Sequence, residues 1–491
     1  MSIWKRKPLA LLLAEAADSE KGLKRTLTAW SLIALGIGAI IGAGLFVRTA
    51  MAASQNAGPS VTIAFIVAAI GCALAGLCYA ELSSSIPISG SAYTYTYATM
   101  GEFMAWIIGW DLILEYAVGA ATVGIAWSEY LNNLLVNVLH LNPIPYSLSH
   151  SPFQSNIETG ETGIINLPAL FIVGIISLLL IKGIQESAFV NGVIVVLKVV
   201  IVILIIFIGW NFVNPANHTP YIPPSSIFTD EHGIDHHFGG FWGIIGAAGT
   251  VFFAFIGFDA VSTAAQETKN PKRNMPIGIL GSLAICTILY ILFAHVLTGV
   301  ATVEDFRTGG KEASVAFAIN KYMIGYEWLG QLVTVAILAG FSSVILVMLL
   351  GQSRVFYSMG KDGLLPKMFS DLHSKYKTPY KANIAILVIV GAFAAFVPGD
   401  IVGDMTSIGT LFAFVLVCIS VIVLRKTEPN MQREFKTPFV PLVPLLGVAA
   451  CVLMMVGLGW TNWLRLFAWM ALGVIIYFIY SKKNSNLNNP K

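Results

Sequence analysis

Charged side chains are scarce in this sequence: Asp, Glu, Lys and Arg make up 11% of its 491 residues, whereas hydrophobic residues make up 56%. Together with a mean hydropathy of +0.76, this excludes an ordinary soluble protein and predicts a chain that crosses a membrane several times. The net charge of +3 reflects where the basic residues lie in the topology, so we expect no nucleic-acid partner.

Cysteines and processing signals are also few. The five cysteines, Cys72, Cys78, Cys286, Cys418 and Cys451, lie in apolar stretches without metal-site spacing, so we expect small core residues and no disulfide bonds. Residues 8–18 contain a short apolar patch followed by acidic residues, with no small-residue cleavage site. This excludes a signal peptide and favours a helix lying on the inner membrane surface.

The sequence lacks the residue patterns that an intramembrane enzyme needs. His295 lies inside an apolar run without a catalytic partner. The sequence also lacks the ring of charged residues that would indicate a channel pore. His232, His236 and His237 share a polar connection, where an exposed loop explains them better than a metal site. We therefore expect no enzyme activity, no cofactor and no metal.

Twelve apolar runs are each long enough to cross about 30 Å of hydrocarbon. They lie near residues 28–52, 61–85, 101–131, 165–183, 188–212, 240–265, 276–300, 330–358, 383–398, 404–425, 441–457 and 463–480. The sequence therefore predicts an all-α, multi-pass protein of a cell inner membrane or plasma membrane with twelve transmembrane helices.

The basic residues predict the orientation of these helices. Segments on one side hold 23 of the 29 Lys and Arg residues, segments on the other side hold five, and Lys198 lies inside the fifth run. Because basic residues concentrate in cytoplasmic loops, both termini are predicted to be cytoplasmic. The basic loop 354–382 is expected to contact anionic membrane lipid.

The first run contains a weak point for a helix. Residues 36–44 read GIGAIIGAG, and each glycine costs a helix interior about 1 kcal/mol relative to alanine. A broken helix survives in a membrane only where it is packed in protein or lines a polar cavity. The run therefore predicts either a binding site or a small-residue packing face through Gly38 and Gly42.

A second weak helix favours the binding site. The sixth run carries Gly246, Gly249 and Gly257 followed by Asp259, and it comes five runs after the first. Broken helices at corresponding places in two five-helix halves are typical of transporters built from inverted repeats, with the substrate site between the breaks.

Seven motifs resemble those of the amino acid, polyamine and organocation transporter superfamily, and most closely the cationic amino acid transporter family with its bacterial relatives. They are GIGAIIGAG at 36–44, PISGSAYTY at 87–95, GWDLILEY at 109–116, AFIGFD at 254–259, KNP at 269–271, RVFY at 354–357 and KDGLLP at 361–366. Many relatives have paired acids before the KNP motif, whereas this chain has Gln266 and Glu267, which affects an inner-gate ion pair.

The resemblance implies a leucine-transporter-like 5+5 inverted repeat with two extra helices. Repeat 1 would span 28–212, repeat 2 would span 240–425, and the extra helices would span 441–480. A cytoplasmic N-terminal segment at 1–27 and a C-terminal tail at 481–491 would flank them.

The resemblance also places a free L-amino acid between the two breaks. Its carboxylate would meet N–H groups around Ala43 and Gly44, and its ammonium would meet carbonyls near Ile40, Phe253, Ala254 and Ile256. Helix polarity agrees independently, because the N-terminus of a half-helix favours an anion and carbonyl ends favour a cation.

Lys198 is the basic residue inside an otherwise apolar run, where an ammonium costs about 2.5 kcal/mol or more. A buried amine can bind and release a proton during a transport cycle. In related transporters the matching lysine occupies the place of sodium, which implies proton coupling here. The alternative is a static cation tied to backbone carbonyls. Sodium binding by Ser342 and Ser343 is disfavoured beside Lys198.

Two acids share one face of the third run. Asp111 and Glu115 are four residues apart and buried by position. For Asp111 we favour a structural hydrogen bond to a helix end. Glu115 matches a family acid near the site, so a structural role, contact with a cationic substrate and proton coupling all stay open.

Three further residues have expected roles. Phe253 matches an aromatic gate over the substrate, and Asp259 is expected to brace the sixth helix. Met348 matches a position in the side-chain pocket, where a bulky thioether favours small or neutral side chains over arginine.

The sequence therefore predicts a secondary active transporter that imports L-amino acids by alternating access, coupled to protons. The alternatives are a cationic amino acid transporter, an exchanger and a non-transporting receptor. A small membrane subunit and a monomeric state both stay open.

Overall fold

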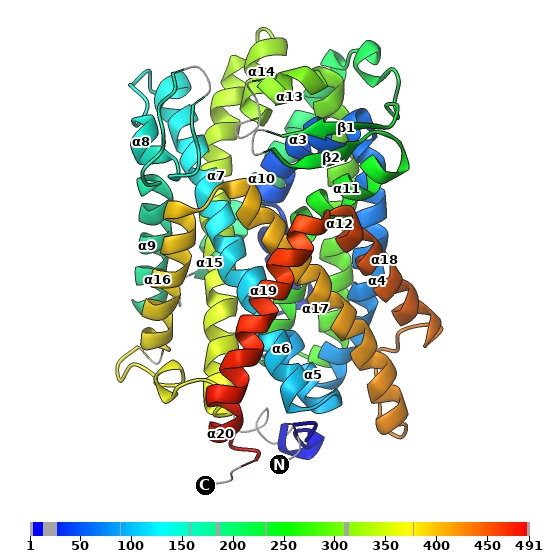
Figure 1. Cartoon of the computed structure of the whole chain (residues 1–491). Coiled ribbons are helices and arrows are strands. Elements are labelled where there is room, and N and C mark those ends of the chain that lie inside the picture. Colours follow the sequence, from blue (N-terminus) through cyan, green and yellow to red (C-terminus); the bar gives the residue numbers. More distant parts are fainter. Residues whose placement is uncertain are drawn as a thin grey trace.

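The computed structural model describes residues 3–12, 27–88, 90–156, 159–182, 187–230, 233–308, 314–376 and 378–488. Long helices run side by side through the molecule (Figure 1). Residues 3–12 and α20 (Lys482–Asn484) lie at one end of the bundle, and α13 (Val303–Thr308) and α14 (Ser314–Tyr322) lie at the other.

Among the described residues, eight helical segments are long and apolar enough to cross a membrane, and four shorter apolar helices accompany them. The predicted runs other than the first and the sixth contain α4 (Val61–Ser85), α6 (Glu102–Leu112) and α7 (Gly119–Asn133) in one run, α9 (Leu167–Lys182), α10 (Ser187–Gly209), α12 (Pro271–Val300), α15 (Glu327–Lys361), α16 (Tyr380–Phe396), α17 (Gly399–Thr427), α18 (Leu442–Gly457) and α19 (Trp460–Ile476). Their bounds agree with the predicted runs to within about five residues.

Short helical turns extend or interrupt several of these helices. The π-helical segments are η2 (Gly44–Arg48), η3 (Ala53–Ala57), η5 (Ile113–Val118), η6 (Leu134–Val138) and η12 (Tyr477–Ser481), and the 3₁₀ turns are η4 (Gly58–Ser60), η7 (Trp210–Phe212), η8 (Pro215–His218), η9 (Phe253–Phe255), η10 (Asp259–Glu267) and η11 (Lys367–Phe369). Wide π-turns inside α-helices often mark functional sites, and η5 contains Glu115.

The connections hold more structure than the sequence predicts. The outer connection at 213–239 forms an antiparallel hairpin of β1 (Ser226–Thr229) and β2 (Asp235–Phe238), with Ser226 opposite Phe238. This hairpin is a local departure from the expected all-α fold, which is otherwise mostly helical in the described residues. Further short helices are α5 (Ser91–Thr99) and α8 (Tyr146–Ser149). Of the predicted surface helix at 8–18, residues 13–18 lie outside the described residues.

The core forms where helices from distant parts of the chain pack together. Helix α4 packs against α12 and α11 (Gly240–Phe252), α7 packs against α15, and α16 packs against α9. The five cysteines are free and buried, as predicted for small core residues.

Candidate functional site

The break predicted within residues 28–52 is confirmed. Helix α2 (Ala29–Ile40) ends at Ile41, whose ψ of 102° leaves the helical region. The second half resumes as η2, and its first backbone bonds run from the N–H groups of Leu45 and Phe46 to the carbonyl of Gly42. The N–H groups of Ala43 and Gly44 precede these bonds at the positive end of the half-helix.

The break predicted in the sixth run is also confirmed. Helix α11 ends at Phe252, η9 covers one turn, and Ile256 is extended with ψ 134°. Gly257 follows with φ +116°, a backbone region that side chains other than glycine rarely adopt. The chain continues as η10 from Asp259.

The two breaks lie directly against each other. A Cβ atom on Gly44 would lie 2.1 Å from the Cα atom of Ala254, so the two backbones touch at this point. A Cβ atom on Gly257 would similarly lie 2.9 Å from the Cβ atom of Ala39. The structure thus brings together Ile40, Ala43, Gly44, Phe253, Ala254 and Ile256, all of them buried.

Tyr290 of α12 bridges the breaks, which the sequence analysis did not anticipate. Its hydroxyl lies 2.9 Å from the carbonyl oxygen of Ile40 and 3.0 Å from that of Ala254. These are two of the four carbonyls predicted to meet an ammonium group. A tyrosine within an apolar run was the available signal, because a buried hydroxyl needs a partner.

Replacing Tyr290 with phenylalanine is expected to lower the free energy of unfolding by about 1–3 kcal/mol, because it leaves two buried carbonyls without their donor. Thermal unfolding of the purified protein in detergent would measure this. Tyr79→Phe is the matched control, since the Tyr79 hydroxyl is buried and has no hydrogen-bond partner in the described part of the chain. Equal losses in both variants would contradict the bridging role.

Lys198 ends on the first break. Its Nζ atom donates hydrogen bonds of 2.9 Å to the carbonyl oxygens of Gly38 and Ile41, the last turn of α2. The aliphatic stem packs on Gly340 of α15, where a Cβ atom would lie 2.7 Å from the lysine Cε atom. The amine therefore links α10 to the C-terminal end of the first half-helix. The hydroxyl of Ser342 donates to Leu338 within its own helix.

Three fully buried acids cluster beside the second break. Glu115 interacts electrostatically with both Asp259 and Asp111, and the hydroxyl of Tyr116 donates to Asp259. The bond from Tyr116 ties η5 to η10, and the bracing role of Asp259 stays a prediction. The hydrogen bond expected from Asp111 to a helix end is wrong: both its carboxylate oxygens lack a partner among the described residues.

Phe253 lies beneath an ion pair. The guanidinium of Arg48, at the end of η2, pairs with Asp404 of α17 and lies 5.9 Å from the centre of the Phe253 ring. Arg48 is only 2% exposed, and Asn462 also donates to Asp404. Arg48 is one of the five basic residues that the sequence assigns to the outer side. These contacts link the end of η2, the ring of Phe253 and α17.

Met348 lies near the first break on α15. One helical turn earlier, Val344 packs against Gly42, where a Cβ atom would lie 3.1 Å from its Cγ2 atom. The sulfur of Met348 faces Gly119 of α7, as does the methyl group of Thr406 of α17. Met348 therefore lies where three helices meet.

A second set of contacts surrounds Asp362, at the end of α15. The ammonium of Lys7 and the hydroxyl of Tyr93 both bind Asp362, at 2.8 Å and 2.7 Å. Deeper in the molecule, the hydroxyls of Ser262 and Ser91 lie 3.2 Å apart. The side chains of Gln266 and Glu267, the noted departure from the family pattern, lie outside the described residues.

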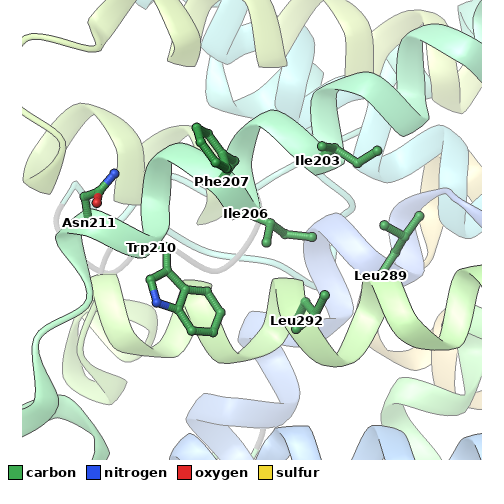
Figure 2. Close-up of a pocket in the computed structure, with 7 residues that line it drawn as sticks. All are labelled: Ile203, Ile206, Phe207, Trp210, Asn211, Leu289 and Leu292. Atoms are coloured by element: carbon green, nitrogen blue, oxygen red, sulfur yellow. The ribbon is translucent and has the colours of Figure 1, made fainter.

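Two hollows lie away from the breaks. One of about 390 Å³ lies between α10 and α12 and contains none of the predicted site residues (Figure 2); its lining is Ile203, Ile206, Phe207, Trp210, Asn211, Leu289 and Leu292. The other, about 340 Å³, has Asp404, Arg465 and His236 among its lining residues. His236 bonds to Asp230, the described residues hold no group of three potential metal ligands, and His232 lies outside them.

Comparisons with known proteins agree on one family. The sequence model described as amino acid permease matches residues 27–481. The chain is 43% identical to the branched-chain amino acid permease BcaP of Bacillus subtilis and 40% identical to the methylthioribose transporter of the same organism, covering 99% of each protein and of itself. It is 34% identical to the vacuolar cationic amino acid transporter 2 of Arabidopsis thaliana, over 86% of this chain and 64% of that protein.

Proposed function

Because the chain belongs to the amino acid permease family, we propose that it imports free L-amino acids across the plasma membrane by alternating access. The chain is a multi-pass membrane transporter of amino acids and not an enzyme. The observation that carries the proposal is the direct contact of two broken helices at Gly44 and Ala254, because such paired breaks form the substrate sites of inverted-repeat transporters.

The substrate is held by its two charged ends. Its carboxylate binds the N–H groups of Ala43 and Gly44 at the start of η2, and its ammonium binds carbonyls among Ile40, Phe253, Ala254 and Ile256. A carbonyl oxygen has two lone pairs, so those of Ile40 and Ala254 accept from the ammonium beside Tyr290. The polarity of the helix ends supports this orientation.

The side chain of the substrate is neutral and aliphatic. Met348 fills the space between α7, α15 and α17, which leaves an apolar surface and less room for a long guanidinium side chain. The similarity to a branched-chain amino acid permease supports this choice. The similarity to a cationic amino acid transporter, with Glu115 as the acidic partner, supports the alternative of arginine or lysine.

Protons drive the import. Lys198 binds the last turn of α2 through two hydrogen bonds, which are stronger while the amine carries its positive charge, so loss of a proton weakens its hold on the first half-helix. Glu115 and Asp259 form the second group that can carry a proton, since two neighbouring buried carboxyls are more stable when they share one.

The membrane topology follows from the same premise. The eight long apolar helices and the four shorter ones supply twelve crossings. Repeat 1 spans 28–212, repeat 2 spans 240–425, and two helices at 441–480 follow. Both termini lie in the cytoplasm, which the location of residues 3–12 and α20 at one end of the bundle supports (Figure 1).

Alternating access then exchanges two sets of closing contacts. The Arg48–Asp404 pair and Phe253 close the outer side, and the contacts of Lys7 and Tyr93 with Asp362 close the inner side. Opening on either side requires only its own set to separate.

A thermal-shift panel of all twenty amino acids and methylthioribose, each at two pH values, tests the function, because a ligand that binds the native state raises its apparent stability. We expect leucine, isoleucine, valine and alanine to stabilise the protein more than arginine does. Counterflow of the hits in proteoliposomes then separates a transporter from a receptor, which gives none.

Stronger stabilisation by arginine than by alanine would contradict the neutral preference. Stabilisation by methylthioribose alone would contradict an amino acid substrate.

A further inference from the structure

Glu102 is the first residue of α6, and its carboxylate is fully buried. Each of its two oxygens accepts two hydrogen bonds. It accepts hydrogen bonds from the hydroxyls of Tyr97 and Tyr477, at 3.0 Å and 3.1 Å. Two more donors come from the C-terminal segment 485–488: the hydroxyl of Ser485 and the amide of Asn488, the latter at 3.0 Å. A buried acid with this many donors fixes the chain segments that supply them.

The backbone beside Glu102 holds the N-terminal segment 3–7. The N–H group of Glu102 donates to the carbonyl of Lys5, and that of Phe103 donates to the carbonyl of Ile3, at 3.1 Å and 3.0 Å. The ammonium of Lys5 in turn bonds to the carbonyl of Leu487 at 2.6 Å. Glu102 thus holds one terminal segment by its side chain and the other by its backbone, and the two segments also contact each other.

The C-terminal segment also holds the turn that carries Asp362. The N–H group of Asn486 donates to the Asp362 carbonyl at 3.0 Å, and its side-chain amide donates to the Lys361 carbonyl at 2.7 Å. Asp362 is the partner of Lys7 in the inner closure. The C-terminal segment therefore fixes Asp362, the acceptor of the closing ion pair. Glu102 and Lys5 fix the N-terminal segment, which carries the donor Lys7.

We infer that Glu102 is a positioning residue. Together with residues 485–488, it holds the N-terminal segment across the inner end of the site and so stabilises the inward-closed state. This inference rests on the proposed alternating-access function. Lys7 bonds to the carbonyl of Tyr97 in α5 and to Asp362 at the end of α15, and the Ser262–Ser91 contact joins η10 to the start of α5. Ser262 therefore becomes accessible from the inner side only after residues 3–7 separate from α5 and α15.

A cysteine reporter tests whether Glu102 and residues 485–488 hold the N-terminal segment in place. The five natural cysteines are all buried, so Ser262→Cys supplies a thiol that a membrane-impermeant maleimide reaches when the inner side opens. In inside-out vesicles, Ser485→Ala with Asn488→Ala is expected to raise the labelling rate about tenfold, because two hydrogen bonds to a carboxylate are lost. Ser485→Thr keeps the hydroxyl and is expected to label at the unaltered rate.

Asn484→Ala is the matched control, because within the described part of the chain the side chain of Asn484 bonds to the carbonyl of Tyr480 in its own helical turn, at 2.9 Å. An unchanged rate in the double variant, or an equal acceleration in Asn484→Ala, would overturn the inference. If the double variant unfolds in a detergent thermal scan, Asn488→Ala alone carries the comparison, with about a threefold rise expected. Absence of amino acid uptake by the unaltered protein would reject the proposed function. If the protein transports but the double variant and the unaltered protein label at equal rates, only the positioning role of Glu102 and residues 485–488 is rejected.

Discussion

Replacing Lys198 with methionine is expected to abolish proton-driven accumulation of substrate, so that the internal concentration only equals the external one. Methionine keeps most of the volume against Gly340 but cannot donate to the carbonyls of Gly38 and Ile41. Each hydrogen bond from a charged donor contributes about 1.5–3 kcal/mol. The variant therefore loses both the link between α10 and the first half-helix and the group that binds the proton.

Uptake into proteoliposomes with an imposed pH gradient measures the effect, and counterflow without a gradient measures exchange. A proton-carrying lysine predicts that exchange survives and accumulation does not. A static tie to the backbone predicts that both are lost. Accumulation retained in Lys198→Met or Lys198→Ala would contradict the coupling role, and Lys182→Met, at an exposed lysine near the end of α9, serves as the control.

Gly44→Ala is expected to reduce substrate affinity about 100-fold or more. The added Cβ atom would lie 2.1 Å from the Cα atom of Ala254, which is backbone and cannot rotate away. The two breaks must separate, and a forced separation of this kind costs about 3 kcal/mol or more, which corresponds to at least about 100-fold in affinity. Isothermal titration of the best hit from the thermal-shift panel would measure the loss.

Gly174→Ala is the matched control for this variant. Gly174 lies in the middle of α9, and a Cβ atom there would meet no atom within 4 Å. Alanine is also the better helix former, so the control is expected to bind substrate normally. Normal affinity in Gly44→Ala would show that the breaks do not form the binding site.

Much of the fold followed from the sequence because a membrane makes local composition decisive. Apolar runs must become helices with all backbone groups paired, and helix α4 has the same bounds as its predicted run. The hairpin β1–β2 was missed because it lies outside the membrane, where its short polar strands depend on neighbours. Asn56 binds the carbonyl of His237, and Arg307 lies between the rings of Phe228 and Phe238.

The hydrogen-bond and ion-pair partners of individual site residues could not be predicted from the sequence. The cost of burying an amine indicates that Lys198 needs partners, but only the packing of α10 on α2 identifies them as Gly38 and Ile41. Arg48 and Asp404 are 356 residues apart in sequence, and no local pattern connects them. The same holds for Tyr290, whose hydroxyl meets two carbonyls that come together only after both breaks have formed.

The sequence by itself determined where the helices run and where two of them break, because both depend on hydrophobicity and on glycine within a few neighbouring residues. It also determined which side chains are too polar for the membrane to tolerate unpaired. Only the tertiary structure decided how those breaks meet, which groups the polar side chains bind, and how Glu102 holds the two terminal segments together. Those contacts join residues far apart in the chain, and their geometry is set by the packing of whole helices rather than by local preference.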